Sequence, residues 1–154
     1  MAEESFITDE MRKAIGMESE PQVFVFERGA LQRYLEAVGD SNSLWLDEGY
    51  ARQHGWARCP IPPNWLVTVI AGAGGGRIRP PRSPSLTRSA AGGDVLEIYQ
   101  PVYLGDTITS VARIADIQQH NRRNGPMVTT IQETIYTNQL GEVVAKDSST
   151  GLSW

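Results

Sequence analysis

The chain has 154 residues, of which 40% are hydrophobic and 21% charged, and its net charge is −4. This composition is that of an ordinary globular protein, and it excludes a disordered, collagen-like or disulfide-built chain. At 17.0 kDa, a folded surface of roughly 7,700 Å² is expected against roughly 25,000 Å² for the unfolded chain. That ratio allows one well-buried core, so a single domain is predicted.

The sequence also limits the cellular compartment and the class of binding partner that we expect. The longest largely apolar run, residues 65–73, is far shorter than the roughly 20 residues of a membrane helix. Residues 1–11 hold four acids and no base, unlike a secretory signal. A single cysteine, Cys59, cannot form an internal disulfide. We therefore expect a cytoplasmic protein, and its negative charge argues against a nucleic-acid partner.

The first half of the chain predicts helices around one short strand. A short helix begins near Asp9 and ends at Gly16. Residues 22–27 are rich in β-branched and aromatic residues, which predicts a strand. Residues 27–38 place apolar side chains at i, i+3, i+4 and i+7, which predicts an amphipathic helix capped by Gly39.

Two further helices are predicted before the middle of the chain. One covers residues 47–53. The other, residues 64–71, follows Pro62 and Pro63 and has few polar groups, so it should be buried. Its β-branched content alone would also fit a strand, but proline suits the first turn of a helix, where its missing N–H costs nothing.

Residues 72–93 form a long segment of glycine, proline, arginine and serine. Loops of this length in a compact domain are usually functional or disordered. The segment belongs to a longer stretch, residues 49–93, that contains no acid and six arginines: Arg52, Arg58, Arg77, Arg79, Arg82 and Arg88. A local basic field can attract an anionic ligand such as a phosphate, although a solvated arginine-rich loop fits the same pattern.

The segment does not carry a cofactor motif. Gly72 and Gly74 are followed by Arg77 where a dinucleotide fingerprint needs a third glycine. The sequence also holds no set of His, Cys and Glu at metal-ligand spacing. Neither a cofactor nor a metal is expected.

The second half predicts strands. Four runs, residues 95–102, 107–118, 127–137 and 142–153, are separated by short turns. Such a series is typical of an antiparallel meander. Together with one buried helix it predicts an α+β fold in which a curved antiparallel sheet wraps around a central helix.

Several short pieces occur in the order found in one family. They are Ile7 to Met11, Gly39 to Asp47, Tyr50-Ala51, Trp56, Pro60 to Trp65, Leu104-Gly105-Asp106, Met127-Val128 and Asn138 to Glu142. The chain resembles the N-terminal domain type of MaoC-like acyl dehydratases, a domain also found in fungal-type fatty acid synthase. The resemblance covers nearly all of residues 1–154 and implies a single hot-dog fold, with the loop 72–93 inside it, that pairs with a second hot dog.

The resemblance also implies hydration of trans-2-enoyl thioesters to (R)-3-hydroxyacyl thioesters, or the reverse dehydration. Catalytic members carry Gly-Asp-x-Asn-Pro-Leu-His, whose Asp and His flank the reacting water. The matching stretch here keeps Asp40 and Asn42 but has Trp45 in place of the histidine. Tryptophan does not exchange a proton near neutral pH, because its indole N–H only donates. Asp40 and Asn42 are thus degenerate catalytic candidates.

The family's His-Gly at the start of the central helix is replaced by Pro63 and Asn64. Asn64 keeps its N–H, so a contact with the enolate oxygen is conceivable. By the resemblance, Trp45, Trp65 and the loop 72–93 would line the acyl group. The loop arginines are candidates for the phosphates of coenzyme A, since guanidinium pairs with phosphate in bidentate geometry. They are Arg77, Arg79, Arg82 and Arg88.

The leading hypothesis is a non-catalytic subunit of a heteromeric (R)-specific enoyl-CoA hydratase, which shapes the acyl tunnel of a catalytic MaoC-like partner. Its substrate would be a thioester of coenzyme A or of an acyl carrier protein. Three alternatives stay open: a homodimeric acyl-thioester-binding scaffold without chemistry, a self-sufficient hydratase that uses Asp40, and a hot-dog thioesterase. His54, His120 and Cys59 are expected to be structural or surface residues rather than catalytic ones.

Overall fold

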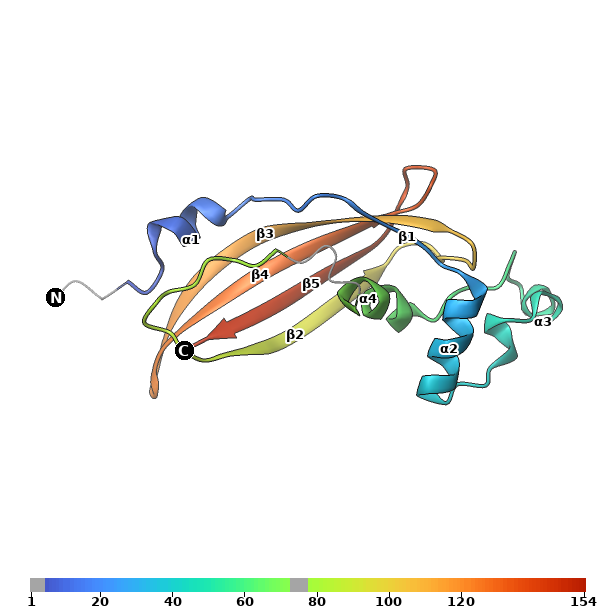
Figure 1. The fold of residues 1–154 in the computed structure, drawn as a ribbon, viewed down its shortest axis with the longest axis horizontal. Coiled ribbons are helices and arrows are strands. Elements are labelled where there is room, and N and C mark those ends of the chain that lie inside the picture. Colours follow the sequence, from blue (N-terminus) through green and yellow to red (C-terminus); the bar gives the residue numbers. More distant parts are fainter. Residues whose placement is uncertain (1–4, 73–77) are drawn as a thin grey trace.

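A computed structural model describes residues 5–72 and 78–154, without the side chains of residues 69–72. Its elements, in chain order, are α1 (Asp9–Ala14), β1 (Gln22–Val25), α2 (Arg28–Val38), the short 3₁₀ turn η1 (Ser43–Trp45), α3 (Glu48–Gln53), α4 (Pro63–Gly72), β2 (Ser89–Ile98), β3 (Thr107–Arg122), β4 (Gly125–Thr137) and β5 (Val143–Ser153). The strands form one antiparallel sheet in the order β1-β3-β4-β5-β2. The sheet is long and curved, and α4 lies against it (Figure 1).

Local sequence signals account for the helices. The Thr8 hydroxyl accepts a hydrogen bond from the Met11 N–H and caps α1. Gly39 ends α2 in the left-handed conformation, at φ 73°. α4 begins at Pro63, as the proline pair predicts. The predicted α+β fold with a curved antiparallel sheet is confirmed. β3, β4 and β5 form the predicted meander, but the prediction was wrong for β2, which pairs with β5 instead of with β3.

The first half of β2 departs from the prediction. Residues 89–93 were expected to lie in a loop, but they pair with β5, and the register shifts between Ala91 and Gly93. A Cβ on Gly92 would come within 3.1 Å of the Leu152 side chain and 3.2 Å of the Thr150 carbonyl oxygen. Glycine at this position therefore lets the edge strand approach β5 closely, and the shift is a β-bulge.

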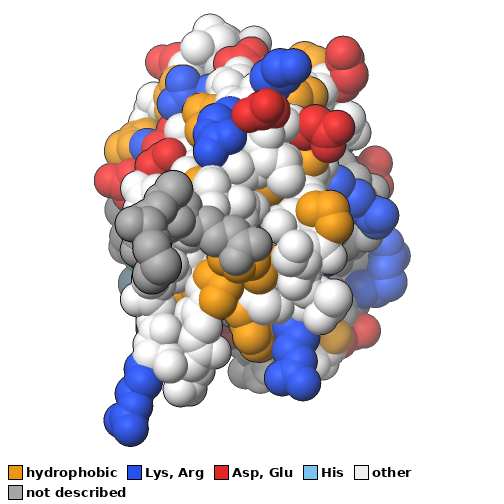
Figure 2. Space-filling model, turned by 90° about the vertical axis from the view of Figure 1, so that its left-hand side faces the viewer, with side chains coloured by type: hydrophobic (Ala, Val, Ile, Leu, Met, Phe, Trp, Pro, Cys, Tyr) orange, Lys and Arg blue, Asp and Glu red, His pale blue; other side chains and the backbone are white. Residues whose placement is uncertain are grey.

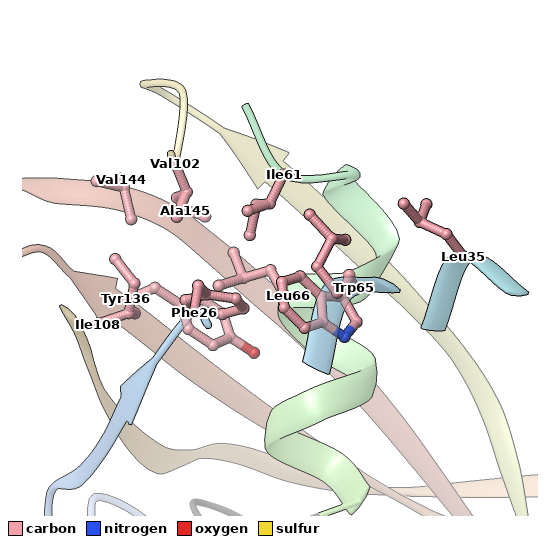
Figure 3. Packing of buried hydrophobic residues seen from close by; sticks show 11 residues of the cluster. Phe26, Leu35, Ile61, Trp65, Leu66, Val102, Ile108, Tyr136, Val144 and Ala145 are labelled. Atoms are coloured by element: carbon pink, nitrogen blue, oxygen red, sulfur yellow. The ribbon is translucent and has the colours of Figure 1, made fainter. Parts of the chain in front are cut away.

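The main core lies between α4, α2 and the inner face of the sheet. Trp65 and Leu66 of α4 pack with Phe26 and with side chains of α2, β3, β4 and β5 (Figure 3). The Phe26 and Trp65 rings meet edge to face, with centroids 4.9 Å apart. A second cluster joins α1 and residues 78–86 to the far ends of β3 and β4. The helix is thus fixed over one part of the sheet only.

The two edges of the sheet differ. β1 has four residues, whereas β2 has ten, nearly all of them exposed. The chain's accessible surface is 9381 Å², about a fifth more than the roughly 7,700 Å² of a compact monomer of this mass. In the part of the chain that the structure describes, we find no helix long and apolar enough to cross a membrane.

Candidate functional site around Asp40, Trp45 and the start of α4

The segment that joins α2 to α3 holds the predicted catalytic candidates, and hydrogen bonds fix its shape. The half-buried Asp40 accepts two of them, from the Asn42 N–H at 2.9 Å and from the Trp45 indole Nε1–H at 2.8 Å. The Asn42 side-chain oxygen caps the turn η1 by accepting from the Leu44 N–H at 3.0 Å. The Asp47 carboxylate accepts from the Tyr50 N–H at the start of α3. These polar side chains are therefore engaged in loop structure.

This arrangement has a chemical consequence for Asp40. A general base must pass the proton it takes to another group or to solvent, and an Asp/His pair does so through the imidazole. Here the carboxylate faces an indole, which donates and cannot accept. Asp40 and Trp45 make a fixed contact rather than a proton-transfer pair.

The start of α4 is held by the loop before it. The Ile61 N–H donates to the Val102 carbonyl and the Leu104 N–H to the Cys59 carbonyl, both at 2.9 Å. Cys59 is buried, and burial raises the pKa of its thiol. The expectation that Cys59 is a core residue agrees with this position.

Asp106, in the turn before β3, fixes the same region from the other side. Its buried carboxylate accepts from Arg58 at 2.9 Å, from the Gln139 amide at 3.1 Å and from the Tyr103 N–H at 2.9 Å. The Arg58 guanidinium also lies over the Tyr103 ring, 4.7 Å from its centroid. Arg58, one of the six arginines of the acid-free stretch, therefore stabilises this turn through Asp106 and Tyr103.

An apolar cavity of about 390 Å³ opens beside the start of α4. Its walls come from three regions and include Trp45, Trp56, Pro63, Ile98 and Tyr99. Among residues 39–47, all of which the structure describes, only Trp45 lines this cavity. The indole therefore separates the apolar cavity from the carboxylate to which it donates.

The predicted substrate-binding residues are not all brought together. Trp45 lines the apolar cavity, whereas Trp65 is only 3% exposed and lies in the core. A contact of Trp65 with the acyl group stays a prediction. The large ring of Trp65 is needed to fill the space between Phe26 and Tyr34. Asn64 is exposed in the first turn of α4. Its contact with an enolate oxygen stays a prediction.

The loop arginines lie elsewhere. Arg79 and Arg82 border a second cavity, of about 970 Å³, formed by residues 78–89 and the sheet. Arg88 is exposed, and its backbone pairs with that of Trp154. Arg77 lies outside the described residues. Their role toward phosphates stays a prediction.

The two histidines make local contacts in the structure. His54 is exposed and stacks on Tyr50, and the His120 Nε2 lies 3.0 Å from the Thr129 hydroxyl. Within the described residues, no group of three or more His, Cys, Asp or Glu side chains could hold a metal ion. Ile98 and Tyr99 of the apolar cavity were not singled out from the sequence, although their exposure at a strand end is consistent with a binding surface.

Comparison with known proteins places these features in a family. The model of the FAS1-like dehydratase domain region matches residues 13–147. A UPF0336 protein of Parafrankia sp. (strain EAN1pec) is 30% identical over 127 residues, covering 80% of each chain. A UPF0336 protein of Thermobifida fusca (strain YX) is 23% identical over 137 residues, covering 85% of this chain and 90% of the relative.

Solved structures of the same fold include subunit complexes. A chain of the ChsH1-ChsH2 complex from Mycobacterium tuberculosis superposes with a TM-score of 0.76 at 19% identity, covering 94% of this chain and 86% of that one. A chain of the HadBC (3R-hydroxyacyl-ACP dehydratase) complex from the same organism gives 0.69 at 19% identity, covering 95% and 98%. The (R)-hydratase from A. caviae gives 0.64 at 18% identity, covering 89% and 94%. These likenesses establish the fold, and the predicted hot-dog fold is confirmed.

Proposed function

Because the chain belongs to the FAS1-like dehydratase domain-region family, we propose that it is the non-catalytic subunit of an (R)-specific enoyl-thioester hydratase or 3-hydroxyacyl-thioester dehydratase. In this proposal a second hot-dog subunit supplies the acid and the base. This chain supplies walls of the acyl site. The names of the structural neighbours, an (R)-hydratase and a 3R-hydroxyacyl-ACP dehydratase complex, support this reaction class.

The hydrogen bond from Trp45 to Asp40 is the observation that carries the proposal. Hydration of an enoyl thioester needs a base for the attacking water and an acid for the α-carbon. The segment that resembles the family's catalytic stretch keeps its aspartate but engages it with an indole donor at 2.8 Å. The same argument disfavours the self-sufficient hydratase that would use Asp40.

The free edge of β2 supports pairing with a second subunit. β2 pairs with β5 on one side, and no described strand lies on its other side. Its outer residue Val95 is 63% exposed, and Ile98 and Tyr99 at its end are 48% and 54% exposed. A long exposed edge strand is a template for strand addition, and natural proteins normally cover it. The isolated chain exposes roughly 1,700 Å² more than a compact monomer of its mass, which is about twice the area that one partner buries in a standard interface.

The apolar cavity adjoins this edge, since Ile98 and Tyr99 line it. A subunit that added a strand to β2 would therefore close the cavity from outside. In the proposal, the acyl group lies between Trp45 and Trp56 on this chain and the catalytic residues of the partner. Such a shared site explains why this chain would line the acyl group without supplying the acid or the base.

Co-expression with a hot-dog chain that carries Gly-Asp-x-Asn-Pro-Leu-His tests the proposal. We expect a stable complex by size-exclusion chromatography with light scattering. We also expect hydration of crotonyl-CoA or a longer enoyl-CoA, followed at the enoyl absorbance, by the complex only. Val95→Lys should dissociate the complex. Val23→Lys on β1, where the side chain is 62% exposed, is the matched control and should leave it intact. Full activity of this chain alone would contradict the proposal.

A further inference from the structure

The second cavity has no role in the function proposed above. It measures about 970 Å³ and lies toward the C-terminal half of β5, between the sheet and residues 78–89. Apolar side chains of Ile78, Leu86 and Val128 and the hydroxyl groups of Thr130 and Ser149 line it. A space of this size is within the range of pockets that bind drug-sized ligands. Seen from the end of the molecule that carries the C-terminus, hydrophobic side chains gather between basic ones (Figure 2).

One side chain in this cavity is buried and oriented. Gln132 of β4 is 7% exposed, and its Oε1 accepts a hydrogen bond from the Ile78 N–H at 3.0 Å. The N–H can only donate, so the amide oxygen must face it and the Nε2 must face the other way. Among the described residues the structure records no hydrogen-bond acceptor for that Nε2. Because Gln132 lines the cavity, this donor is available to a ligand there.

We propose that this cavity binds the distal part of an acyl group and that Gln132 selects acyl groups carrying a hydrogen-bond-accepting oxygen there, such as a ketone or hydroxyl. The proposal rests on the function above for the ligand being an acyl thioester. A hydrocarbon in the cavity would leave the two N–H donors of Nε2 buried without a partner, which is unfavourable. A carbonyl oxygen of the ligand at the same place accepts the hydrogen bond that Nε2 donates to water in the empty cavity.

The phosphate end of the thioester carrier is the other candidate occupant, because Arg79 and Arg82 border the cavity. Both arginines are exposed, and the described guanidinium contact, from Arg82 to the Ser89 hydroxyl at 3.2 Å, is itself exposed. Gln132, in contrast, is held from two sides, by Ile78 and by its place in a central strand. A buried, fixed amide suits a neutral oxygen better than a hydrated dianion.

Two saturated N-acetylcysteamine thioesters test the proposal on the full chain. One carries a 5-(4-oxocyclohexyl)pentanoyl group and the other a 5-cyclohexylpentanoyl group, so neither can be hydrated. By isothermal titration calorimetry we expect the ketone to bind about tenfold more tightly, the discrimination of one buried hydrogen bond. In ¹H–¹⁵N spectra the Gln132 side-chain amide should shift on binding of the ketone and less on binding of the hydrocarbon.

Three variants sharpen the test. Gln132→Glu keeps the oxygen that accepts from Ile78 and removes the donor, and Gln132→Leu removes both, so each should abolish the preference for the ketone. Gln119→Leu is the matched control, since the Gln119 Oε1 also accepts a backbone N–H, from Phe6 at 2.7 Å, but does not line the cavity. It should keep the preference.

Equal binding of the two thioesters by the unaltered chain, or binding of neither, would overturn the inference. Binding of adenosine 3′,5′-bisphosphate that Arg79→Ala or Arg82→Ala abolishes would assign the cavity to the carrier and also overturn it. None of these results bears on pairing or turnover, which the co-expression experiment measures separately. The experiments therefore distinguish a failure of the inference about this cavity from a failure of the proposed function.

Discussion

Replacing Asp40 by asparagine tests whether this residue is a structural acceptor. Its carboxylate receives two donors, the Asn42 N–H and the Trp45 indole N–H. An asparagine at this position has one oxygen, so whichever way the amide turns, its NH₂ group faces one of the two donors. We therefore expect Asp40→Asn to destabilise the fold even though the side chain keeps its shape.

The magnitude follows from the half-buried setting. A hydrogen bond to a charged acceptor contributes about 1.5–3 kcal/mol when well buried, so about 1–2 kcal/mol is expected here. For a chain of this length that lowers Tm by about 3–6 °C. Urea unfolding of Asp40→Asn, Trp45→Phe and the double variant gives the coupling between the two side chains, which should be about 1 kcal/mol.

This double-mutant cycle of Asp40 and Trp45 can refute the reasoning in two ways. A coupling near zero would show that the indole–carboxylate contact does not stabilise the loop. An Asp40→Asn variant as stable as the original, but with a large loss of turnover in the assembled enzyme, would identify Asp40 as a catalytic group after all.

Three further predictions concern the support of the site. Asp106→Ala should lower the free energy of unfolding by about 1–3 kcal/mol, because it removes the buried acceptor shared by the partly exposed Arg58, Gln139 and Tyr103 N–H donors; no measurable loss in urea would contradict the network. Trp65→Ala should cost about 3–5 kcal/mol by the same measurement, as expected for a core aromatic, and a surface-like value would contradict its core position. Hydrogen bonds from Lys146 and then from Arg113 hold the pKa of Glu133 below its usual value, so their stabilisation should be complete above about pH 5 and lost as pH falls below about 4. Glu133→Gln should make the Tm from thermal melts fall less steeply at low pH. An unchanged dependence of Tm on pH would contradict this contribution of Glu133.

The sequence predicted the architecture because most of its signals are local. Proline at the start of α4, glycine at the end of α2 and alternating strands with short turns act over a few residues. The start of β2 was missed for the opposite reason. Ser-Ala-Ala-Gly-Gly has low strand propensity, and only pairing with β5, with Gly92 packed against Leu152, makes it a strand.

The site was only partly predictable. The tryptophan at position 45 could be read directly from the sequence, but the hydrogen bond between Trp45 and Asp40 depends on how the loop turns back on itself. The burial of Trp65 could not be read from the sequence, because aromatic character alone does not separate a core residue from one that lines a cavity. Gln132 gave no signal, since a polar residue in a strand usually faces solvent. Its burial arises from Ile78, 54 positions away in the chain.

The most direct test of the central claim is the kcat of the assembled enzyme with Asp40→Asn in this chain alone. Urea unfolding of the same sample shows that the variant is folded at the assay temperature. If this chain supplies walls and the partner supplies the acid and the base, kcat for enoyl-CoA hydration should stay within about twofold of the unaltered enzyme, whereas losing a general acid or base typically costs 10²–10⁴-fold. A fall of about 100-fold or more would contradict the account.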